Sequence, residues 1–298
     1  MHDALRSFSE RHTKEVEYMS WPVKDLNDRI YAERGDFLIF AGYPSTGKSA
    51  WALQCAWHWA ARYKVGFFSL ETSSEKLFDR QMAAVVGIGM GDIKRNQISD
   101  NDWAQFSAMS TEIMKRKLEL IPAAGMSVAD VRAVTMMRGY QIIIVDYLQL
   151  LQGSGINRTE QVTGISLGLH TLAQSLGVTV VALSQLKRKN DSDSPDMSDL
   201  RESGQIEQDA DVVMILKLKE RNRPDGNREL YIAKNKEGTC PMIELAFDGK
   251  HQTFTKASKT GDVVSKFSAD GKKARNRNRE AANKDQMSML PDTYQVPF

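Results

Sequence analysis

The sequence predicts an α/β protein in which a mainly parallel, twisted sheet is flanked by helices. Short apolar runs bounded by polar clusters recur along the chain, and amphipathic stretches separate them. This alternation is expected when helices connect parallel strands. Most of the apolar runs are also continuous rather than alternating with polar residues, which is typical of strands buried on both faces.

The strand and helix predictions follow these runs in order. FLIFA at 37–41 is the first expected strand, and IIIVD at 142–146 is hydrophobic enough to be central. The other expected strands are 65–70, 118–121, 178–183, 211–216, 229–233 and 242–247. The amphipathic stretches predict helices at 49–62, 75–86, 100–116, 127–138 and 159–176. The spacing of Thr72 and Glu75 fits a capping box that opens the second of these helices.

Composition is typical of a soluble globular chain. The 298 residues carry 40 basic and 38 acidic side chains, and 41% of them are hydrophobic. No apolar run approaches the roughly 20 residues that span a bilayer, so we expect no transmembrane helix and no membrane partner. The charges in the first residues also differ from a secretory signal. Cys55 and Cys240 are too few for a disulfide framework or a metal knuckle, and we expect a cytoplasmic protein.

The expected organisation is one folded domain at 21–257, preceded by a segment at 1–20 and followed by a flexible polar tail at 258–298. The tail has little apolar mass to offset chain entropy and carries a net charge of +3. Inside the domain, the Ser- and Asp-rich residues 187–204 are expected to form a loop. Because the rest of the chain has a net charge of −1, nucleic-acid binding has to be argued from local basic positions.

Residues 42–49, GYPSTGKS, form what we call the phosphate loop. They match GxxxxGK[ST] directly after an expected strand and directly before an expected helix. The glycines let backbone N–H groups surround a phosphate, Lys48 can bridge phosphate oxygens, and Ser49 can offer its hydroxyl to Mg²⁺. A coincidental glycine turn is the alternative, but its context favours nucleotide binding. The expected nucleotide-binding residues are Gly42, Ser45, Thr46, Gly47, Lys48, Ser49 and Asp146.

Three polar residues lie at or just after the carboxyl ends of expected strands. Asp146 would stand beside the phosphate loop, where open α/β sheets bind ligands, and is expected to hold Mg²⁺ through water; capping a turn is the alternative. Glu71 is the candidate general base that polarises the attacking water, with a helix-dipole role as the alternative. Gln185 can hydrogen-bond a γ-phosphate on one side and a loop on the other.

Together these segments resemble the RecA-like motor domain of DnaB-type replicative helicases over about residues 21–256. GYPSTGKSAWALQ is similar to the Walker A segment of that family, FFSLETS to its catalytic-glutamate strand, IIIVDYLQLL to its Walker B segment and VVALSQLKR to its glutamine-sensor segment. SDLRESGQIEQDADVVMIL resembles the DNA-loop motif, a string that RecA recombinases and KaiC-type ATPases lack. The resemblance implies a RecA-like P-loop NTPase core that uses ATP and Mg²⁺.

The resemblance also implies contacts with single-stranded DNA. It places Arg201, Glu202 and Gly204 on a loop that faces a central channel. Arg201 can pair with a phosphate and Gly204 lets a backbone N–H approach one, whereas Glu202 suits an orienting role. The expected DNA-binding residues are Arg201, Glu202, Gly204, Lys187, Arg188 and Arg158.

The remaining basic positions connect to the sensor or to a second loop. Lys187, Arg188 and Lys189 follow Gln185 directly, so a γ-phosphate sensed by Gln185 can shift a basic loop. Solvated loop charges are the alternative for these residues. Arg158 matches a family position near the other channel loop.

In the family, a lysine and an arginine finger reach the hydrolysis site from a neighbouring subunit. The segment IAKNKEG places Lys234 at the lysine position and Lys236 at the arginine position. Lysine lacks the planar fork that grips two oxygens, so we expect slow hydrolysis or a substitute. Arg221, Arg223 and Arg228 are near enough in sequence to substitute. The expected catalytic residues are Glu71, Lys48, Gln185, Lys234 and Lys236.

The resemblance implies an ATP-dependent helicase that forms a ring, expected to be a homohexamer, and translocates 5′ to 3′ on single-stranded DNA while unwinding duplex. About 20 residues precede the motor instead of the family's usual helical domain, as in compact plasmid and phage helicases. Residues 4–19 are expected to form a helix that docks on the neighbouring subunit. Candidate partners are a primase, a loader and a sliding clamp, the last through 286–290 unless this terminus simply frays.

Two other classes stay open. An ATP-switched protein that binds single strands or recruits a partner without processive unwinding is favoured by Lys236 at the position of the arginine. A RecA-type recombinase would form filaments instead of closed rings.

Overall fold

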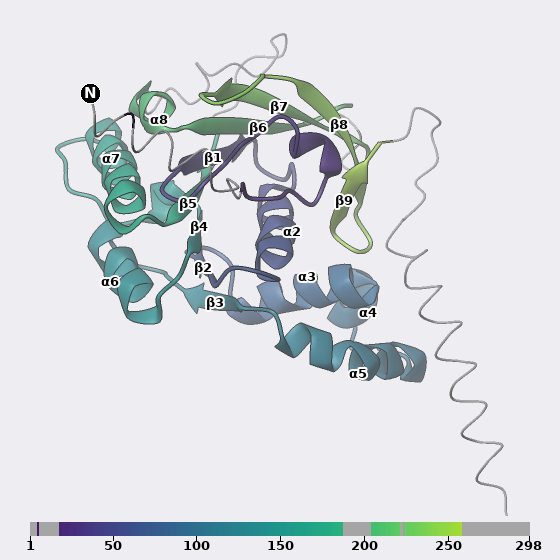
Figure 1. The fold of residues 1–298 in the computed structure, drawn as a ribbon. Helices are drawn as coiled ribbons and strands as arrows, with labels where there is room; N and C mark the ends of the chain where they lie inside the picture. Colours follow the sequence, from purple (N-terminus) through teal and green to yellow (C-terminus); the bar gives the residue numbers. More distant parts are fainter. Residues whose placement is uncertain (1–4, 6–17, 187–203, 221–222, 224, 258–298) are drawn as a thin grey trace, which may run out of the picture. The chain divides into compact units, whose positions relative to one another are not determined.

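The computed structural model describes Leu5 and residues 18–186, 204–220, 223 and 225–257, and the structural statements below concern these residues. They contain one sheet with the strand order β3-β2-β4-β5-β1-β6-β7-β8-β9 (Figure 1). The strands from β3 to β6 in that order are parallel, and β7, β8 and β9 extend the sheet in antiparallel fashion. The expected mainly parallel α/β fold is therefore confirmed.

Each strand that the sequence predicts is present within a few residues. The parallel strands are β1 (Phe37–Gly42), β2 (Val65–Ser69), β3 (Leu118–Pro122), β4 (Ile142–Asp146), β5 (Thr179–Gln185) and β6 (Val212–Leu218). The antiparallel strands are β7 (Arg228–Asn235), β8 (Met242–Asp248) and β9 (Thr253–Lys256). The last of these was not predicted, because its four residues alternate polar and apolar side chains over too short a run.

The five predicted helices are also present. They are α2 (Lys48–Trp59), α3 (Ser74–Val86), α5 (Asp100–Met114), α6 (Val128–Arg138) and α7 (Arg158–Leu176). The short helices α4 (Met90–Lys94) and α8 (Gly204–Asp209) and the 3-10 turns η1 (Lys24–Leu26) and η2 (Leu148–Leu150) were not predicted. The expected loop at 187–204 lies outside the described residues except for Gly204, which begins α8.

Local side-chain contacts explain where several helices begin and end. Ser99 and Ser127 form capping boxes with the third residue of α5 and α6, and Gly139 and Gly177 end α6 and α7 in the left-handed conformation. The expected Thr72 cap was wrong, because the hydroxyl of the next residue, Ser73, accepts the hydrogen bond from the Lys76 amide and shifts the start by one residue.

The core lies on both faces of the sheet, and β1 shows why. Leu38 and Phe40 pack into the cluster that faces α2, whereas Phe37 and Ile39 pack into the cluster that faces α6 and α7. Successive side chains of a strand point to opposite faces, so a strand covered on both sides must be apolar throughout. Burial of each such side chain stabilises the fold by about 1.5–3 kcal/mol.

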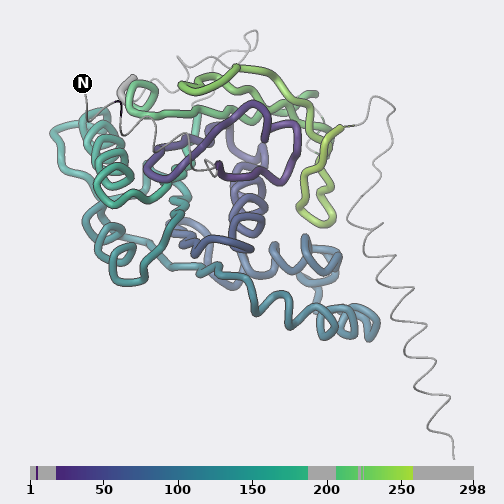
Figure 2. The backbone as a smooth tube through the Cα atoms, in the orientation of Figure 1, coloured from purple at the N-terminus to yellow at the C-terminus, as the bar shows by residue number. Residues whose placement is uncertain are grey.

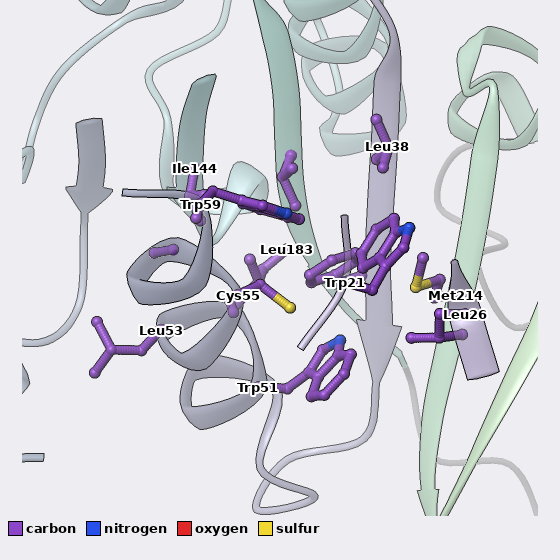
Figure 3. Close-up of a cluster of buried hydrophobic side chains, with 14 of the residues drawn as sticks. Trp21, Leu26, Leu38, Trp51, Leu53, Cys55, Trp59, Ile144, Leu183 and Met214 are labelled. Atoms are coloured by element: carbon purple, nitrogen blue, oxygen red, sulfur yellow. The ribbon is translucent and has the colours of Figure 1, made fainter. Parts of the chain in front are cut away.

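Three tryptophans fill the space between α2 and the sheet (Figure 3). Trp21 and Trp59 meet edge to face with ring centroids 5.4 Å apart, and the indole N–H of Trp59 donates to the Ser20 carbonyl at 2.7 Å. The segment that carries Trp21 also runs beside the C-terminal strands (Figure 2), where the Asn235 amide donates to the Arg29 carbonyl at 2.7 Å. The two ends of the folded chain therefore share this layer.

The parallel strands give the sheet two functionally different edges. At the carboxyl edge the strands β1, β2, β4, β5 and β6 end, and Gly42 of β1 pairs there with Gln185 of β5 and Leu216 of β6. At the amino edge the same strands begin, and the Phe37 amide donates to an Asp211 carboxylate oxygen at 2.8 Å. None of the helices in the described part of the chain has the length and apolarity that a bilayer crossing demands.

Candidate functional site

The phosphate loop lies at the carboxyl edge between β1 and α2. Ser45 and Gly47 have left-handed backbones, with φ of 64° and 100°. Side chains have no room at two of its glycines: a Cβ on Gly42 would lie 2.5 Å from the Leu216 carbonyl oxygen, and one on Gly47 would lie 2.9 Å from the Phe254 ring. Left-handed residues before a helix N-terminus direct backbone N–H groups into one concavity, which suits an anion.

Lys48 is folded over this loop. Its ammonium group donates to the carbonyl oxygens of Gly42 at 2.8 Å and Tyr43 at 2.9 Å. Burial lowers the pKa of Lys48 to about 8, although the charges of Asp146 and Glu71 partly oppose that shift. A phosphate nearby would stabilise the charged lysine, so this side chain fits a nucleotide.

Asp146 ends the interior strand β4, as the sequence predicts, and is 5% exposed. Burial raises the pKa of Asp146, while a hydrogen bond from the Ser49 hydroxyl and the charge of Lys48 oppose that shift. A buried carboxylate beside a hydroxyl fits a hard cation such as Mg²⁺. Among the described residues no group of three or more His, Cys, Asp or Glu could hold a metal ion, so phosphate oxygens and water would have to complete its coordination.

Glu71 follows β2 at the same edge and is exposed. The preceding residue, Leu70, donates its amide to the Asp146 carbonyl at 2.9 Å, and Ser69 pairs with Asp146 in the sheet. The charge of Glu71 raises the pKa values of both Lys48 and Asp146, which also places it near them. The structure thus brings the expected base, lysine and cation ligand to one edge.

Gln185 ends β5 beside the start of the phosphate loop, and its neighbour Gln149 is a residue that sequence reasoning missed. The Gln149 amide nitrogen donates to the Ser184 hydroxyl at 2.9 Å and to the Gln185 carbonyl at 3.3 Å, and its amide oxygen accepts from the Gln185 N–H at 3.3 Å. The Arg158 guanidinium donates to the Gln149 carbonyl. The signal was present in DYLQLL, where one amide follows Asp146 in an otherwise apolar run.

Lys234 and Lys236 lie at the amino edge, and the structure does not bring them to Lys48 of the same chain. The Lys234 ammonium donates to the carbonyls of Glu207 at 2.6 Å and Gln208 at 3.1 Å, at the end of α8. Lys236 forms an ion pair of 2.5 Å with Asp211, the residue that also accepts from the amide of Phe37.

Arg228 cannot be the substitute finger that its position in the sequence allows. Its side chain is buried, with 1% of the residue exposed, and its Nε donates to the Thr46 carbonyl of its own phosphate loop at 2.9 Å. A side chain enclosed behind one loop cannot extend to a neighbouring subunit. Arg223 is exposed and pairs with Glu220 at 3.3 Å, and Arg221 lies outside the described residues.

Most of the expected DNA contacts fall outside the described residues, namely Lys187, Arg188, Arg201 and Glu202, and so does the neighbouring Lys189. Gly204 is the first residue of α8, and Arg158 is the exposed first residue of α7. The expected sliding-clamp motif at 286–290 also lies outside the described residues. Of the expected helix at 4–19, the structure describes Leu5 and residues 18 and 19.

Residues 23–256 match the family described as the DnaB-like helicase C-terminal domain. The replicative DNA helicase DnaB of Geobacillus stearothermophilus is 34% identical over 246 residues, which cover 77% of this chain and 54% of that protein. The chain spans about half the length of the curated relatives it matches.

Two solved structures are similar to the chain. A DnaB-like replicative helicase, described with its interactions with primase, matches with a TM-score of 0.77 and 31% identity over 84% of this chain and 66% of that one. A second structure, described as an ATPase domain, matches with a TM-score of 0.76 and 29% identity over 86% of this chain and 98% of that one. These likenesses confirm the RecA-like fold that the sequence predicts.

Proposed function

This chain belongs to the DnaB-like helicase C-terminal domain family, and we propose that it is an ATP-dependent DNA helicase motor of replicative type. In this proposal the phosphate loop binds ATP, Asp146 and Ser49 hold Mg²⁺ partly through water, and Glu71 polarises the attacking water. Bound Mg²⁺ would neutralise charge on the phosphate oxygens. The observation that carries the proposal is the meeting of Lys48, Asp146 and Glu71 at the carboxyl edge in a chain of this family.

We propose that the active form is a homohexameric ring whose hydrolysis sites lie between subunits. Lys234 and Lys236 lie at the amino edge, away from the phosphate loop, and would serve the site of a neighbour. Gln185 would sense the γ-phosphate from its place beside Gly42. Residues 4–19 would dock each subunit on the next, and the family likeness supports this arrangement.

Within the ring, single-stranded DNA would pass along channel loops that contain Arg158, Lys187, Arg188, Arg201, Glu202 and Gly204. Contacts to phosphates predict little sequence preference and an affinity that falls steeply as salt rises from roughly 50 to 200 mM. The likeness to a replicative helicase described with primase supports a primase partner, and a loader and a sliding clamp are further candidates. Translocation is proposed to run 5′ to 3′.

An unwinding assay on a forked duplex tests activity, substrate and polarity together. Duplexes that offer the protein either a 5′ or a 3′ single-stranded tail for loading are compared. Each is tested with ATP and with a non-hydrolysable analogue, for the wild type and for the Glu71→Gln variant. We expect ATP-dependent strand separation by the wild type on the 5′-tailed fork and none by the variant. Strand separation that did not need ATP, or none on either fork, would contradict the proposal.

A second candidate function is an ATP-switched single-strand-binding or recruitment protein without processive unwinding. It is favoured by Lys236, which stands at the arginine position and is held by Asp211 at 2.5 Å. The Lys236→Arg variant separates the two functions. A motor that is limited by its finger should hydrolyse ATP and unwind faster, whereas a switch should unwind in neither form.

A further inference from the structure

Arg228, the first residue of β7, lies directly behind the phosphate loop. Its Nε donates to the Thr46 carbonyl at 2.9 Å and one terminal nitrogen donates to the Gly226 carbonyl. The guanidinium carbon lies 4.5 Å from the centre of the Phe247 ring. A buried charge destabilises a fold unless it is hydrogen-bonded, and an apolar side chain would fill the same space without that penalty. Packing alone therefore does not explain why an arginine occupies position 228.

The geometry of the peptide group suggests the reason. In a trans peptide the carbonyl and the N–H of the next residue point in opposite directions. The Thr46–Gly47 peptide is trans, because the cis bond in the described residues is Asp146–Tyr147. When Arg228 holds the Thr46 carbonyl from behind, the Gly47 N–H is turned toward the other side of the loop. Backbone N–H groups are what a phosphate loop offers to an anion.

A second contact fixes the same peptide group. The Phe254 ring lies so close to Gly47 that a Cβ on this residue would be only 2.9 Å from it. The same ring packs on Phe247, with ring centroids 4.7 Å apart. Phe247 in turn lies under the guanidinium group of Arg228. The loop is therefore supported by a hydrogen bond at Thr46 and by an aromatic ring at Gly47, and both supports come from the antiparallel strands.

We propose that Arg228 is a positioning residue for nucleotide binding, which holds the Thr46 carbonyl so that the Gly47 N–H faces the phosphates and which adds a fixed positive charge behind them. The inference rests on the proposed nucleotide binding of the phosphate loop. It assigns to the antiparallel half of the sheet a part in recognising the triphosphate. A guanidinium group suits this place because it stays protonated when buried and its fork can hold two carbonyls at once.

The test compares Arg228→Met, Arg228→Lys and Arg228→Gln with the wild type and with Lys217→Met. Lys217 is a matched control, because it lies on the neighbouring strand β6, contacts the Tyr231 ring at 4.6 Å and pairs with Glu229 at 3.0 Å. These contacts are with β7 and not with the phosphate loop. The dissociation constants of ATP and of ADP are measured by calorimetry with full-length protein, and the melting temperature is measured without nucleotide.

We expect Arg228→Met to raise the dissociation constant of ATP by about 10- to 100-fold, the loss typical of a charged hydrogen bond. Arg228→Lys should recover part of that loss, because it restores the charge and one donor. Lys217→Met should lower the melting temperature while leaving the dissociation constant unchanged. If Arg228→Met does not fold, Arg228→Lys and Arg228→Gln decide, since the first should bind more tightly than the second.

Two results would overturn the inference while leaving the proposed function intact. One is a wild-type ATP affinity in every folded Arg228 variant. The other is a loss of affinity in Lys217→Met that matches the loss in Arg228→Met at equal melting temperature, because general destabilisation would then explain both. A wild type that binds neither ATP nor ADP would instead contradict the proposed function itself.

Discussion

The two edges of the sheet carry similar charges in different surroundings. At the carboxyl edge Lys48 and Asp146 are buried next to each other, and burial lowers the pKa of Lys48 to about 8. At the amino edge Lys236 and Asp211 pair in a more open place, and burial raises the pKa of Asp36 beside them to about 6. A phosphate bound at the carboxyl edge would therefore stabilise the charged form of Lys48, whereas Lys236 at the amino edge already has a carboxylate partner.

The distance between the two edges limits which lysines can contact the same phosphate. The six residues of β1 lie between them, which corresponds to roughly 20 Å. No lysine side chain bridges that distance, so Lys48 and Lys236 cannot act on one phosphate within one subunit. If both act in hydrolysis, the site is complete only where the amino edge of one subunit meets the carboxyl edge of another.

Lys48→Ala tests the carboxyl edge with the largest expected effect on ATP binding. Removal of the ammonium group takes away the side chain expected to bridge the phosphate oxygens, so ATP binding should weaken by about 100-fold or more. Calorimetric titration of ATP measures the effect. Lys236→Ala is the control at the amino edge. When both proteins are measured as monomers, this variant should bind ATP as tightly as the wild type does. Equal losses in both variants would contradict the division between the edges.

Glu71→Gln separates binding from chemistry at the same edge. The amide keeps the size of the side chain but cannot accept a proton, so the turnover number should fall by about 10²- to 10⁴-fold. The dissociation constant of ATP should stay within a few-fold of the wild-type value. Steady-state hydrolysis and equilibrium titration give the two numbers. Hydrolysis at the wild-type rate would show that Glu71 is not the base.

Mixing of two inactive variants tests whether the edges meet between subunits. Lys48→Ala subunits keep an intact amino edge, and subunits with both Lys234→Ala and Lys236→Ala keep an intact carboxyl edge. In mixed rings some interfaces combine the two intact edges, so hydrolysis should return to roughly a quarter of the wild-type rate at equal amounts if interfaces act independently. Either variant alone should stay inactive. Absence of any recovery would mean that the lysines do not act across the interface.

The pH dependence of ATP binding gives a smaller expected effect on the dissociation constant than Lys48→Ala does. In the proposed role Lys48 binds phosphate as the ammonium form. Its pKa in the free protein is about 8, and a bound phosphate would raise that pKa. Binding therefore takes up a proton above pH 8, and the dissociation constant should rise by about tenfold per pH unit there. Titrations from pH 7 to 9.5 measure this slope. Asp36→Asn removes the shifted carboxyl of the amino edge and should leave the profile unchanged, and a flat profile in the wild type would argue against Lys48 as a ligand.

The parallel half of the fold was largely predictable, because its strands are continuous apolar runs such as IIIVD and its site follows a contiguous motif. The motif that contains Gly42, Lys48 and Ser49 also predicts where its loop lies in the fold, since such a loop follows a strand and precedes a helix. Glu71 and Asp146 were placed by one rule, that parallel strands end at a common edge. Their roles stay predictions, but their meeting at that edge is observed.

In the antiparallel half, β7 and β8 were predictable and β9 was not, and the sequence does not indicate that this half supports the phosphate loop of its own chain. Arg228 and Phe254 are distant from the phosphate loop in sequence, and no periodicity reports which side chain of a late strand lies behind an early loop. Its short distance from Lys234 in the sequence makes Arg228 a candidate to reach a neighbouring subunit, but its side chain lies behind the phosphate loop of its own chain. The register of β7 against β6 decides the matter, and register depends on tertiary packing.

Gln54 ties these two halves together in a way that bears on synthesis of the protein. Its side-chain amide donates to the Phe254 carbonyl and accepts from the Phe254 N–H, both at 2.8 Å, so it pairs with β9 as a neighbouring strand would. The two residues are 200 positions apart. Because the N-terminal part of a chain leaves the ribosome first, the phosphate loop is synthesised long before β9, the strand that supports it. The nascent domain therefore completes the support of its phosphate loop only after β9 has been translated.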